Sequence, residues 1–371
     1  MTQPSDIIVV GAGIVGCAIA YELASRGASV VVVDARPIGM GATQASAGVL
    51  APYIETHEGS PLLALTVRSL QLFDQFVERV SSDAHTPILY HRSGTLEAAM
   101  DEGEMLRLRG IARTLTALGV PALLLDGAAV RDEEPHLSED AVGGLLIGVH
   151  GFVGAGALTH ALAGAACARG ARVIEASHVR GIARTNGNLT LETDQGALTG
   201  NAVVLAAGSW SGDIPIAGQV NRPPVRPVRG QLLTIGWRGA PLRRVTWSSR
   251  CYLVPWDDAT VLVGATVEEA GFDERVTVAG ARDLLDGVCD IVPHAWTAGF
   301  LGARVGLRPA TPDNLPIIGR SSVVPNLMYA TGHYRNGVLL APLTAKIVAD
   351  AMLEHVLDLA LASVSPARFG L

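Results

Sequence analysis

The chain is poor in lysine, in aromatic residues and in charge of either sign. Lys346 is the only lysine among 28 basic residues; aromatic residues make up 5% and charged residues 17% of the 371 positions. A lysine base or Schiff base is therefore not expected, since Lys346 falls in a predicted surface helix. The net charge of −7 offers no long-range attraction to a polyanion, so no nucleic-acid partner is expected.

Cysteines and long apolar runs are also scarce. The four cysteines are far apart and form no CxxC pair: Cys17, Cys167, Cys251 and Cys289. This spacing predicts neither a metal site nor a disulfide framework, and it favours a reducing, cytoplasmic location. The most apolar early stretch, residues 7–20, lacks a basic leader and carries glycines at fixed spacing. It predicts a buried strand, turn and helix, and no membrane anchor.

Apolar residues make up 49% of a chain long enough for two domains. Strand and helix patterns alternate near both ends and in the middle, whereas the segments between them mix short strands and helices. We predict an α/β fold with a Rossmann-like nucleotide-binding domain and an inserted substrate domain with a mostly antiparallel sheet (α+β). The predicted pieces are 1–85, 146–221 and 301–371 for the first domain, and 86–145 and 222–300 for the second.

A GxGxxG turn spans residues 11–16, between the apolar runs 7–10 and 30–33. Its first glycine suits a tight turn, its second lets the backbone approach a pyrophosphate, and its third lets the helix lie close to the sheet. The helix start then offers N–H groups to the phosphates. Asp34 ends the second run, and its carboxylate can accept hydrogen bonds from ribose hydroxyls. This acid favours FAD or NAD over NADP.

Three further stretches favour FAD, the longer cofactor. Small residues at 39–50 and at the end of the run 203–208 allow a chain to lie along an extended ligand. Residues 329–339 predict a strand, a glycine loop and a helix start that could direct N–H groups at a flavin. Upstream, Arg308 lies between apolar residues and a proline, where it could hold a carboxylate through two parallel hydrogen bonds. A salt bridge at a domain boundary is the alternative role for Arg308.

Several motifs occur together in one order along the chain: GAGIVG at 11–16, ATQASAGVL at 42–50, PVRGQLL at 227–233, CYLVP at 251–255, GLRPATPDNLPIIG at 306–319 and GHYRNGVLLAP at 332–342. On these motifs the chain resembles the D-amino acid oxidase superfamily of flavoproteins, and within it the glycine oxidases of bacterial thiamine synthesis. The resemblance implies a glutathione-reductase-like FAD-binding domain. Many members carry the flavin on a cysteine near the ring, but no cysteine follows Cys289. The FAD is therefore expected to be non-covalent.

The resemblance also implies roles for individual residues. Arg308 would clamp a substrate carboxylate, Tyr252 would share it, and Arg335 would border both flavin and substrate. Asp34 would bind the adenosine ribose, and Val179 would meet the adenine. The motifs and the resemblance together assign the following residues to the cofactor: Gly11, Gly13, Ile14, Val15, Gly16, Asp34, Ala35, Ala42, Thr43, Ala47, Gly48, Val49, Val179, Gly208, His333, Tyr334, Arg335, Asn336, Gly337, Val338 and Leu339. His333 could tune the flavin or merely pack beside it.

The expected activity is an FAD-dependent oxidative deamination of glycine, of small N-substituted glycines or of D-amino acids. Hydride passes from the α-carbon to flavin N5, oxygen reoxidises the flavin to give hydrogen peroxide, and water hydrolyses the imine to a 2-oxo acid and ammonia or an amine. The expected partners are a small amino acid and oxygen, with no membrane, and the resemblance suggests a homotetramer. Three alternatives stay open: a dehydrogenase with another acceptor, a tRNA carboxymethyl-removing oxidase, and a non-catalytic flavin-binding subunit.

Two residues depart from the pattern of the resembled enzymes. Arg250 stands where a histidine or another polar residue is expected, and Val267 stands where a bulkier apolar side chain is expected. A wider or more cationic cavity mouth would admit N-alkyl or N-carboxymethyl substrates. Elsewhere, the pattern predicts one amphipathic helix over 340–364 that packs on the domain, and core positions for Trp247, Trp256 and Trp296.

Overall fold

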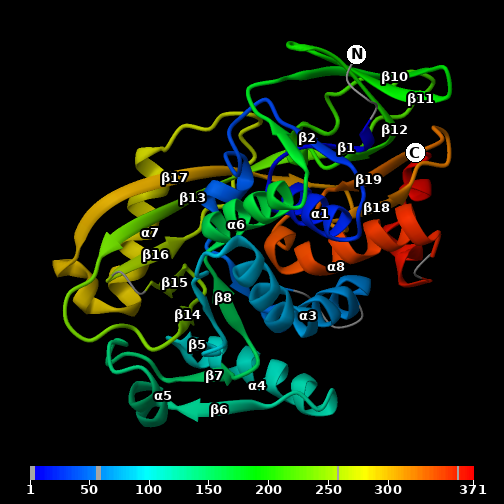
Figure 1. Ribbon diagram of the computed structural model, residues 1–371. Helices are drawn as coiled ribbons and strands as arrows, with labels where there is room; N and C mark the ends of the chain where they lie inside the picture. Colours follow the sequence, from blue (N-terminus) through cyan, green and yellow to red (C-terminus); the bar gives the residue numbers. More distant parts are fainter. Residues whose placement is uncertain (1–4, 56–59, 257–258, 357–358) are drawn as a thin grey trace.

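The structure, a computed structural model, describes residues 5–55, 60–256, 259–356 and 359–371. The chain forms two large sheets and one small sheet, with helices packed mainly on the first (Figure 1). The small sheet joins three short strands: β3 (Val49–Leu50), β8 (Gly151–Val153) and β4 (Tyr90–His91). This small sheet joins two segments from the first hundred residues, β3 and β4, to β8 from the middle of the chain.

The first sheet runs in the order β10 (Val179–Thr185), β11 (Asn188–Thr193), β12 (Gly196–Leu205), β1 (Ser5–Val10), β2 (Val30–Val33) and β9 (Arg172–Ile174). Off this path, β19 (Leu327–Thr331) pairs with β12, and β18 (Ile317–Arg320) pairs with β19. The central pairs β1–β2, β1–β12, β2–β9 and β12–β19 are all parallel. Parallel strands buried on both faces are expected to be continuous apolar runs, and β2 is four consecutive valines, all buried.

Three helices cover one face of the first sheet: α1 (Ile14–Ser25), α6 (Ala155–Ala168) and α8 (Gly337–Ala349). A fourth, α3 (Pro61–Ala84), packs on the outer side of α6 and α8. Successive strand residues point to opposite faces, so Ile7 and Val9 pack with these helices, whereas Ile8 and Val10 pack toward β10 and β11. The first sheet therefore sits between two apolar cores.

The second sheet runs in the order β17 (Gly299–Ala310), β13 (Arg226–Gly236), β16 (Thr260–Gly264), β15 (Tyr252–Pro255), β14 (Val245–Trp247), β5 (Thr95–Ala99), β7 (Gly143–Ile147) and β6 (Ala122–Asp126). All neighbouring pairs are antiparallel except β14–β5. The remaining helices are α2 (Pro52–Glu55), α4 (Glu102–Ala117), α5 (Gly127–Glu133) and α7 (Val278–Ile291). Short 3₁₀ turns lie at Ala42–Ala45, Gly208–Trp210, Pro293–Thr297, Leu359–Val364 and Pro366–Phe369.

The division into two domains stays a prediction, and two of its boundaries fall inside strands. β17 starts at residue 299 and belongs wholly to the second sheet, so the boundary at 300/301 cuts it. β7 spans 143–147 and is cut by the boundary at 145/146. A strand cannot be shared between two domains without breaking its hydrogen-bond ladder. The domain limits are better placed after 310 and after 147.

The prediction of one amphipathic helix over 340–364 is wrong. Helix α8 ends at Ala349 and is followed directly by a π-helical turn, Asp350–Glu354. The helical path ends at His355, which adopts the left-handed conformation (φ 57°). α8 is buried on nearly all sides because it lies against both α1 and α3. A helix enclosed in this way is apolar all round, so its sequence carries no amphipathic signal.

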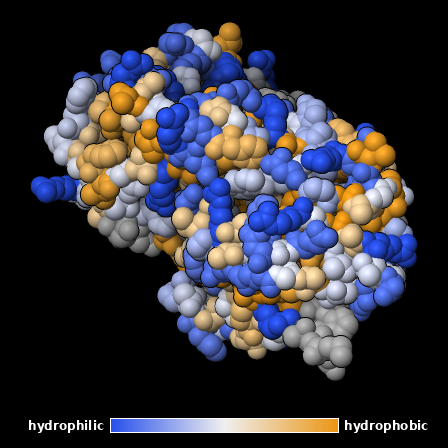
Figure 2. Space-filling model, turned by 90° about the horizontal axis from the view of Figure 1, so that it is seen from above, coloured by the Kyte–Doolittle hydropathy of each residue, from blue (hydrophilic) through white to orange (hydrophobic). Residues whose placement is uncertain are grey.

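The tryptophan prediction is also partly wrong. Trp296 is 75% exposed, and Trp247 and Trp256 are half-buried beside an apolar cluster, where Trp247 also faces the cavity described below. On the face seen from above, apolar and hydrophilic residues are intermixed (Figure 2).

Within the described ranges, none of the helices combines the length and the apolar character needed to cross a bilayer.

Candidate active site

A cavity of about 750 Å³ lies between the two large sheets. On one side it is lined by residues at the carboxyl ends of β1, β2, β12 and β19, and on the other by residues of β15, β16 and β17. Ligands of parallel α/β sheets bind outside the carboxyl ends of the strands. The volume falls within the roughly 300–1,000 Å³ of small-molecule sites.

The GxGxxG turn forms one wall of this cavity. Gly11 has φ 111°, and a Cβ there would lie 2.4 Å from the carbonyl oxygen of Ala206. A Cβ at Gly16 would lie 1.9 Å from the carbonyl oxygen of Gly11, which is why the helix can lie so close to the turn. At Gly13 the nearest atom to a Cβ would be Thr43 Oγ1 at 3.5 Å, so this face is open toward the cavity. Helix α1 therefore points its N-terminus into the cavity.

Asp34 fixes the turn and faces the cavity from the end of β2. Its carboxylate accepts hydrogen bonds from the N–H groups of Ala12 (2.6 Å) and Arg36 (2.8 Å). Burial raises the pKa of Asp34 above its usual value, although these two hydrogen bonds act in the opposite direction. Each carboxylate oxygen can accept two hydrogen bonds, so acceptor capacity remains for a ligand hydroxyl.

The small-residue stretch after β2 forms a second wall. A Cβ at Gly48, which has φ 68°, would lie 1.7 Å from the carbonyl oxygen of Val153, so no other residue fits there. Thr43 accepts a hydrogen bond from the N–H of Ile14 (3.1 Å) at the start of α1. The stretch is thereby tied both to β8 and to the GxGxxG turn.

The loop between β19 and α8 closes one end of the cavity. His333 is buried, and its Nε2 lies 3.1 Å from Thr344 Oγ1. Desolvation lowers the pKa of His333 to about 4, so its ring is neutral at pH 7. Tyr334 has φ 50°, and its N–H donates to the carbonyl of Pro309 (2.9 Å). This bond ties the loop to β17, next to Arg308.

Arg308 and Tyr252 reach the same cavity across the second sheet. The Arg308 guanidinium lies over Gly230, where a Cβ would fall 2.3–2.4 Å from three of its atoms. The Tyr252 ring lies over Gly264, where a Cβ would fall 2.5 Å from Cζ and from Oη. Two glycines on adjacent strands therefore make the space that both side chains occupy.

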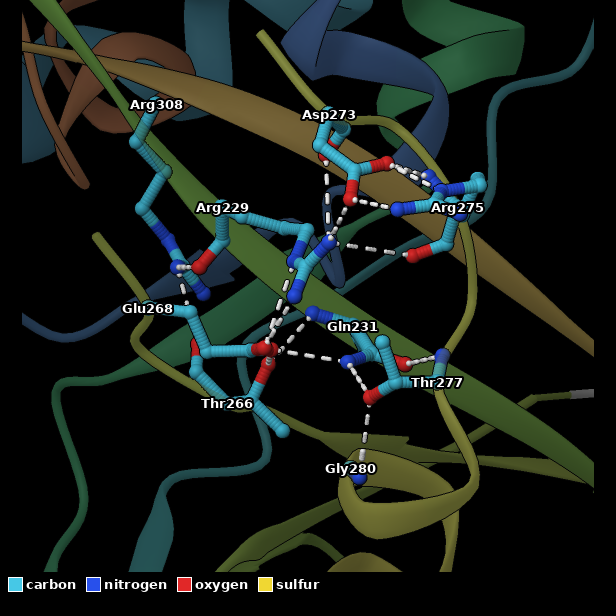
Figure 3. Close-up of polar contacts among 9 residues, drawn as sticks. All are labelled: Arg229, Gln231, Thr266, Glu268, Asp273, Arg275, Thr277, Gly280 and Arg308. Atoms are coloured by element: carbon cyan, nitrogen blue, oxygen red, sulfur yellow. Dashed lines mark hydrogen bonds and ion pairs between the residues drawn. The ribbon is translucent and has the colours of Figure 1, made fainter. Parts of the chain in front are cut away.

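The described hydrogen bonds of the Arg308 guanidinium run to main-chain carbonyls. Its Nη1 donates to Thr266 (2.9 Å) and to Arg229 (3.3 Å) (Figure 3). Arg335, from the loop before α8, is exposed, lines the cavity, and places its guanidinium 5.5 Å from the Tyr334 ring centre. All three residues predicted to act on the substrate therefore border one space.

Among the residues predicted to hold the cofactor, all but two line the cavity. Gly16 is not in the lining and instead allows the close approach of α1 to the turn. Leu339 is 2% exposed and packs in the core between the helices, so it does not face the cavity. The first turn of a helix shows only one face to a ligand, and Leu339 lies on the other.

Sequence reasoning missed several lining residues. Arg36 and Trp210 line the cavity together, with the Arg36 guanidinium 4.3 Å from the Trp210 ring centre. No local motif marks this pair, because the two residues are far apart in sequence. Arg250 does reach the lining, but its guanidinium pairs with Asp290, which offsets its charge at the mouth. Val267 lies at the rim and is 51% exposed.

Comparisons with known proteins agree with this arrangement. The model of the family described as "FAD dependent oxidoreductase" matches residues 6–351. A glycine oxidase from Geobacillus kaustophilus is 33% identical over 365 residues, covering 97% of this chain and 96% of that protein. The crystal structure of glycine oxidase from the same organism matches with a TM-score of 0.94 at 32% identity, covering 98% of each chain.

A bifunctional protein ThiO/ThiG from a Nostoc species is 35% identical over 359 residues, which cover 95% of this chain. The same residues cover 53% of that protein, so the chain spans about half the length of this bifunctional relative.

The cavity residues fit FAD. The GxGxxG turn leaves no room for side chains at Gly11 or Gly16, yet it is open at Gly13 toward the cavity. The helix N-terminus lies beside it, and Asp34 offers acceptors one strand away. The cavity then extends from these residues to the loop before α8, as an elongated dinucleotide requires.

Proposed function

The chain belongs to the FAD dependent oxidoreductase family, and we propose that it oxidises the carbon–nitrogen bond of glycine, of a small N-substituted glycine or of a small D-amino acid. One observation carries this proposal: a single cavity joins a dinucleotide-binding turn to the guanidinium of Arg308 and the phenol of Tyr252. A guanidinium and a phenol that line the same cavity are suited to a carboxylate.

Arg308 and Tyr252 bind and orient the substrate. The guanidinium donates two parallel hydrogen bonds to the carboxylate, and the Tyr252 hydroxyl donates a third. Both side chains are packed over glycines, so little rotational freedom is lost when substrate binds. Holding the carboxylate at one end directs the α-carbon toward the loop before α8 and the exposed guanidinium of Arg335.

The pyrophosphate of FAD would be held by the turn at 11–16 and the start of α1, and the ribose by Asp34. Val179 would border the adenine, and residues 333–338 would line the flavin end of the cavity. Bound FAD would supply a two-electron acceptor for the α-hydrogen, with oxygen as the final electron acceptor. No side chain needs to remove a proton from the α-carbon if the amine is neutral when it reacts. The product imine is hydrolysed by water.

We propose that FAD is held without a covalent bond. Cys251 is the cysteine that lines the cavity, and burial raises the pKa of its thiol to about 12. A thiol that stays protonated is a poor nucleophile toward a flavin. Denaturation should therefore release all of the flavin into the supernatant. A homotetramer remains part of the proposal and is measured by light scattering.

The rim favours substrates somewhat larger than glycine. Val267 leaves space at the mouth, and Arg250 adds a cation that Asp290 only partly offsets because both are exposed. We expect sarcosine and N-ethylglycine to be turned over faster than glycine. Higher turnover of glycine than of every N-substituted analogue would contradict this part of the proposal.

The experiment is a peroxide-release screen of the FAD-loaded protein against glycine, sarcosine, N-ethylglycine, D-alanine and D-proline. Peroxide formation with at least one of them is the expected result. The same substrates are tested anaerobically with an artificial electron acceptor. Acceptor reduction without peroxide would show a dehydrogenase, and no oxidation by either route would overturn the proposal.

A further inference from the structure

After β16 the chain continues antiparallel beside β13 and then turns at Gly271–Phe272 before it enters α7; we call residues 265–277 the crossing segment. It is bound to β13 by main-chain hydrogen bonds: Arg229 N–H donates to Glu268 (2.9 Å), and Glu268 N–H donates to Arg229 (3.0 Å). The N–H of Thr266 donates to Gln231 (3.3 Å). The segment thus lies on the strand whose Gly230 supports the Arg308 guanidinium.

The carboxylate of Glu268 accepts four further hydrogen bonds, three from side chains of β13 and one from Thr266 within the crossing segment (Figure 3). Its Oε2 accepts from Nη2 (2.6 Å) and Nε (3.2 Å) of Arg229. Its Oε1 accepts from Nε2 of Gln231 (2.8 Å) and from the hydroxyl of Thr266 (2.5 Å). Burial alone raises the pKa of Glu268, but these hydrogen bonds outweigh it and hold the pKa below the usual value. The group is therefore anionic with its acceptors filled.

Glu268 binds the side chains of the same two residues whose carbonyls hold Arg308. The Arg308 guanidinium donates to the carbonyl oxygens of Arg229 and Thr266. If Glu268 loses its hydrogen bond to either side chain, that residue loses one of the contacts that fix it, although its main-chain hydrogen bonds remain. The carbonyl that supports the Arg308 guanidinium is then held less rigidly.

Glu268 also balances charge next to the site. The Arg229 side chain is 8% exposed, and its guanidinium pairs with Glu268 and with Asp273 (3.0 Å). Loss of the Glu268 charge would remove one of the two described carboxylate partners of this buried cation.

We propose that Glu268 is a positioning residue for the substrate-binding guanidinium. It acts through Arg229 and Thr266 and does not touch the substrate itself. This inference rests on the proposed function, because it assumes that Arg308 binds the substrate carboxylate. It extends that function from the cavity lining to a network that joins the motif at 227–233 to the crossing segment.

The test measures how tightly the FAD-loaded protein binds acetate, a carboxylate that cannot react, by the change in flavin absorption. In Glu268→Gln the Kd for acetate should rise about tenfold, which corresponds to about 1.4 kcal/mol. The KM for the best amine substrate should rise by a similar factor, with a smaller change in kcat. The control is Glu269→Gln, the adjacent residue, whose ion pair with Arg226 is exposed on both sides. Its Kd should equal that of the wild type.

A purely structural role would lower the thermal stability or the yield of FAD-loaded protein, but it would leave the acetate Kd of the loaded fraction unchanged. If Glu268→Gln does not fold, Thr266→Val is measured instead, because it keeps the charge of Glu268 while it removes the hydroxyl that donates to Glu268 and accepts from the N–H of Gln231. Wild-type acetate affinity in the variant that folds overturns the inference.

Arg308→Ala separates the two failures. If it binds acetate as the wild type does, then the proposed function is wrong at Arg308, and the inference falls with it. If it loses acetate binding while Glu268→Gln keeps it, only the inference fails.

Discussion

Replacing Gly230 by alanine should displace the guanidinium of Arg308 and little else. The new Cβ would lie 2.3–2.4 Å from three guanidinium atoms, whereas ordinary contact begins at 3.4 Å. The guanidinium must therefore move by about 1 Å (3.4 − 2.4 Å). Because it is the far end of a flexible side chain, it can move without breaking the strand, so the protein should fold and bind FAD.

A misplacement of about 1 Å in a catalytic site costs on the order of 10²-fold in rate. We expect kcat/KM of Gly230→Ala to fall by about that factor, or about 2.7 kcal/mol of transition-state stabilisation. The assay is the initial rate of substrate oxidation, normalised to flavin content. The matched control is Gly236→Ala on the same strand, whose Cβ would meet Leu301 Cδ1 at an ordinary 3.6 Å. A threefold or smaller loss in Gly230→Ala, or an equal loss in Gly236→Ala, would refute the reasoning.

Three further outcomes are expected. Tyr252→Phe removes one hydrogen bond to the carboxylate and should lower kcat/KM by about 1 kcal/mol, or roughly fivefold, with flavin content unchanged; an unchanged kcat/KM would contradict this role. Gly11→Ala places a Cβ 2.4 Å from the main-chain oxygen of Ala206 at φ 111°, so purified protein should carry almost no flavin; full flavin occupancy would contradict the turn geometry. His333 has its folded pKa lowered to about 4 from 6.5, so the unfolded state binds more protons between these values and stability falls as pH falls. Between pH 7 and pH 5 the free energy of unfolding of the wild type should therefore fall by about 2 kcal/mol more than that of His333→Gln. Denaturant unfolding at the two pH values measures both changes, and equal changes would contradict the buried, neutral ring.

The cofactor side of the cavity could be predicted because its chemistry is local. The GxGxxG turn, Asp34 and the loop before α8 each lie within a few residues of a strand end, and backbone geometry requires glycine at specific positions. The parallel strands then bring these short segments together at one edge of the sheet. Local sequence patterns were therefore enough to predict most residues that line the cofactor side of the cavity.

The substrate side could be predicted only in part. Tyr252 came from a resemblance, and Arg308 came from its local sequence together with that resemblance. Nothing local marks Gly230 or Gly264 among 42 glycines as the positions that make room for these two side chains. The network around Glu268 joins residues nearly 40 positions apart, and only the register of β13 and the crossing segment brings them together. Contacts across antiparallel strands depend on that register, which no single segment encodes.

The ends of elements were the least predictable features. Residues 340–364 read as one helix because apolar residues continue past Ala349, yet the left-handed conformation of His355 ends the helical path. Trp296 lies within a short 3₁₀ turn on the surface, and the size of its side chain did not indicate this exposure. In both cases tertiary packing decided the outcome, and residue type did not.

The central claim is that Arg308 holds a small amino acid so that its α-carbon faces bound FAD. The direct measurement is anaerobic mixing of the FAD-loaded protein with sarcosine or glycine while the visible flavin absorption is followed. Bleaching in the wild type, with a rate at least a hundredfold lower in Arg308→Ala, is predicted from the loss of a charge-assisted bidentate contact of about 3 kcal/mol. Equal bleaching in both proteins, or none in the wild type with any small amino acid, would contradict the account.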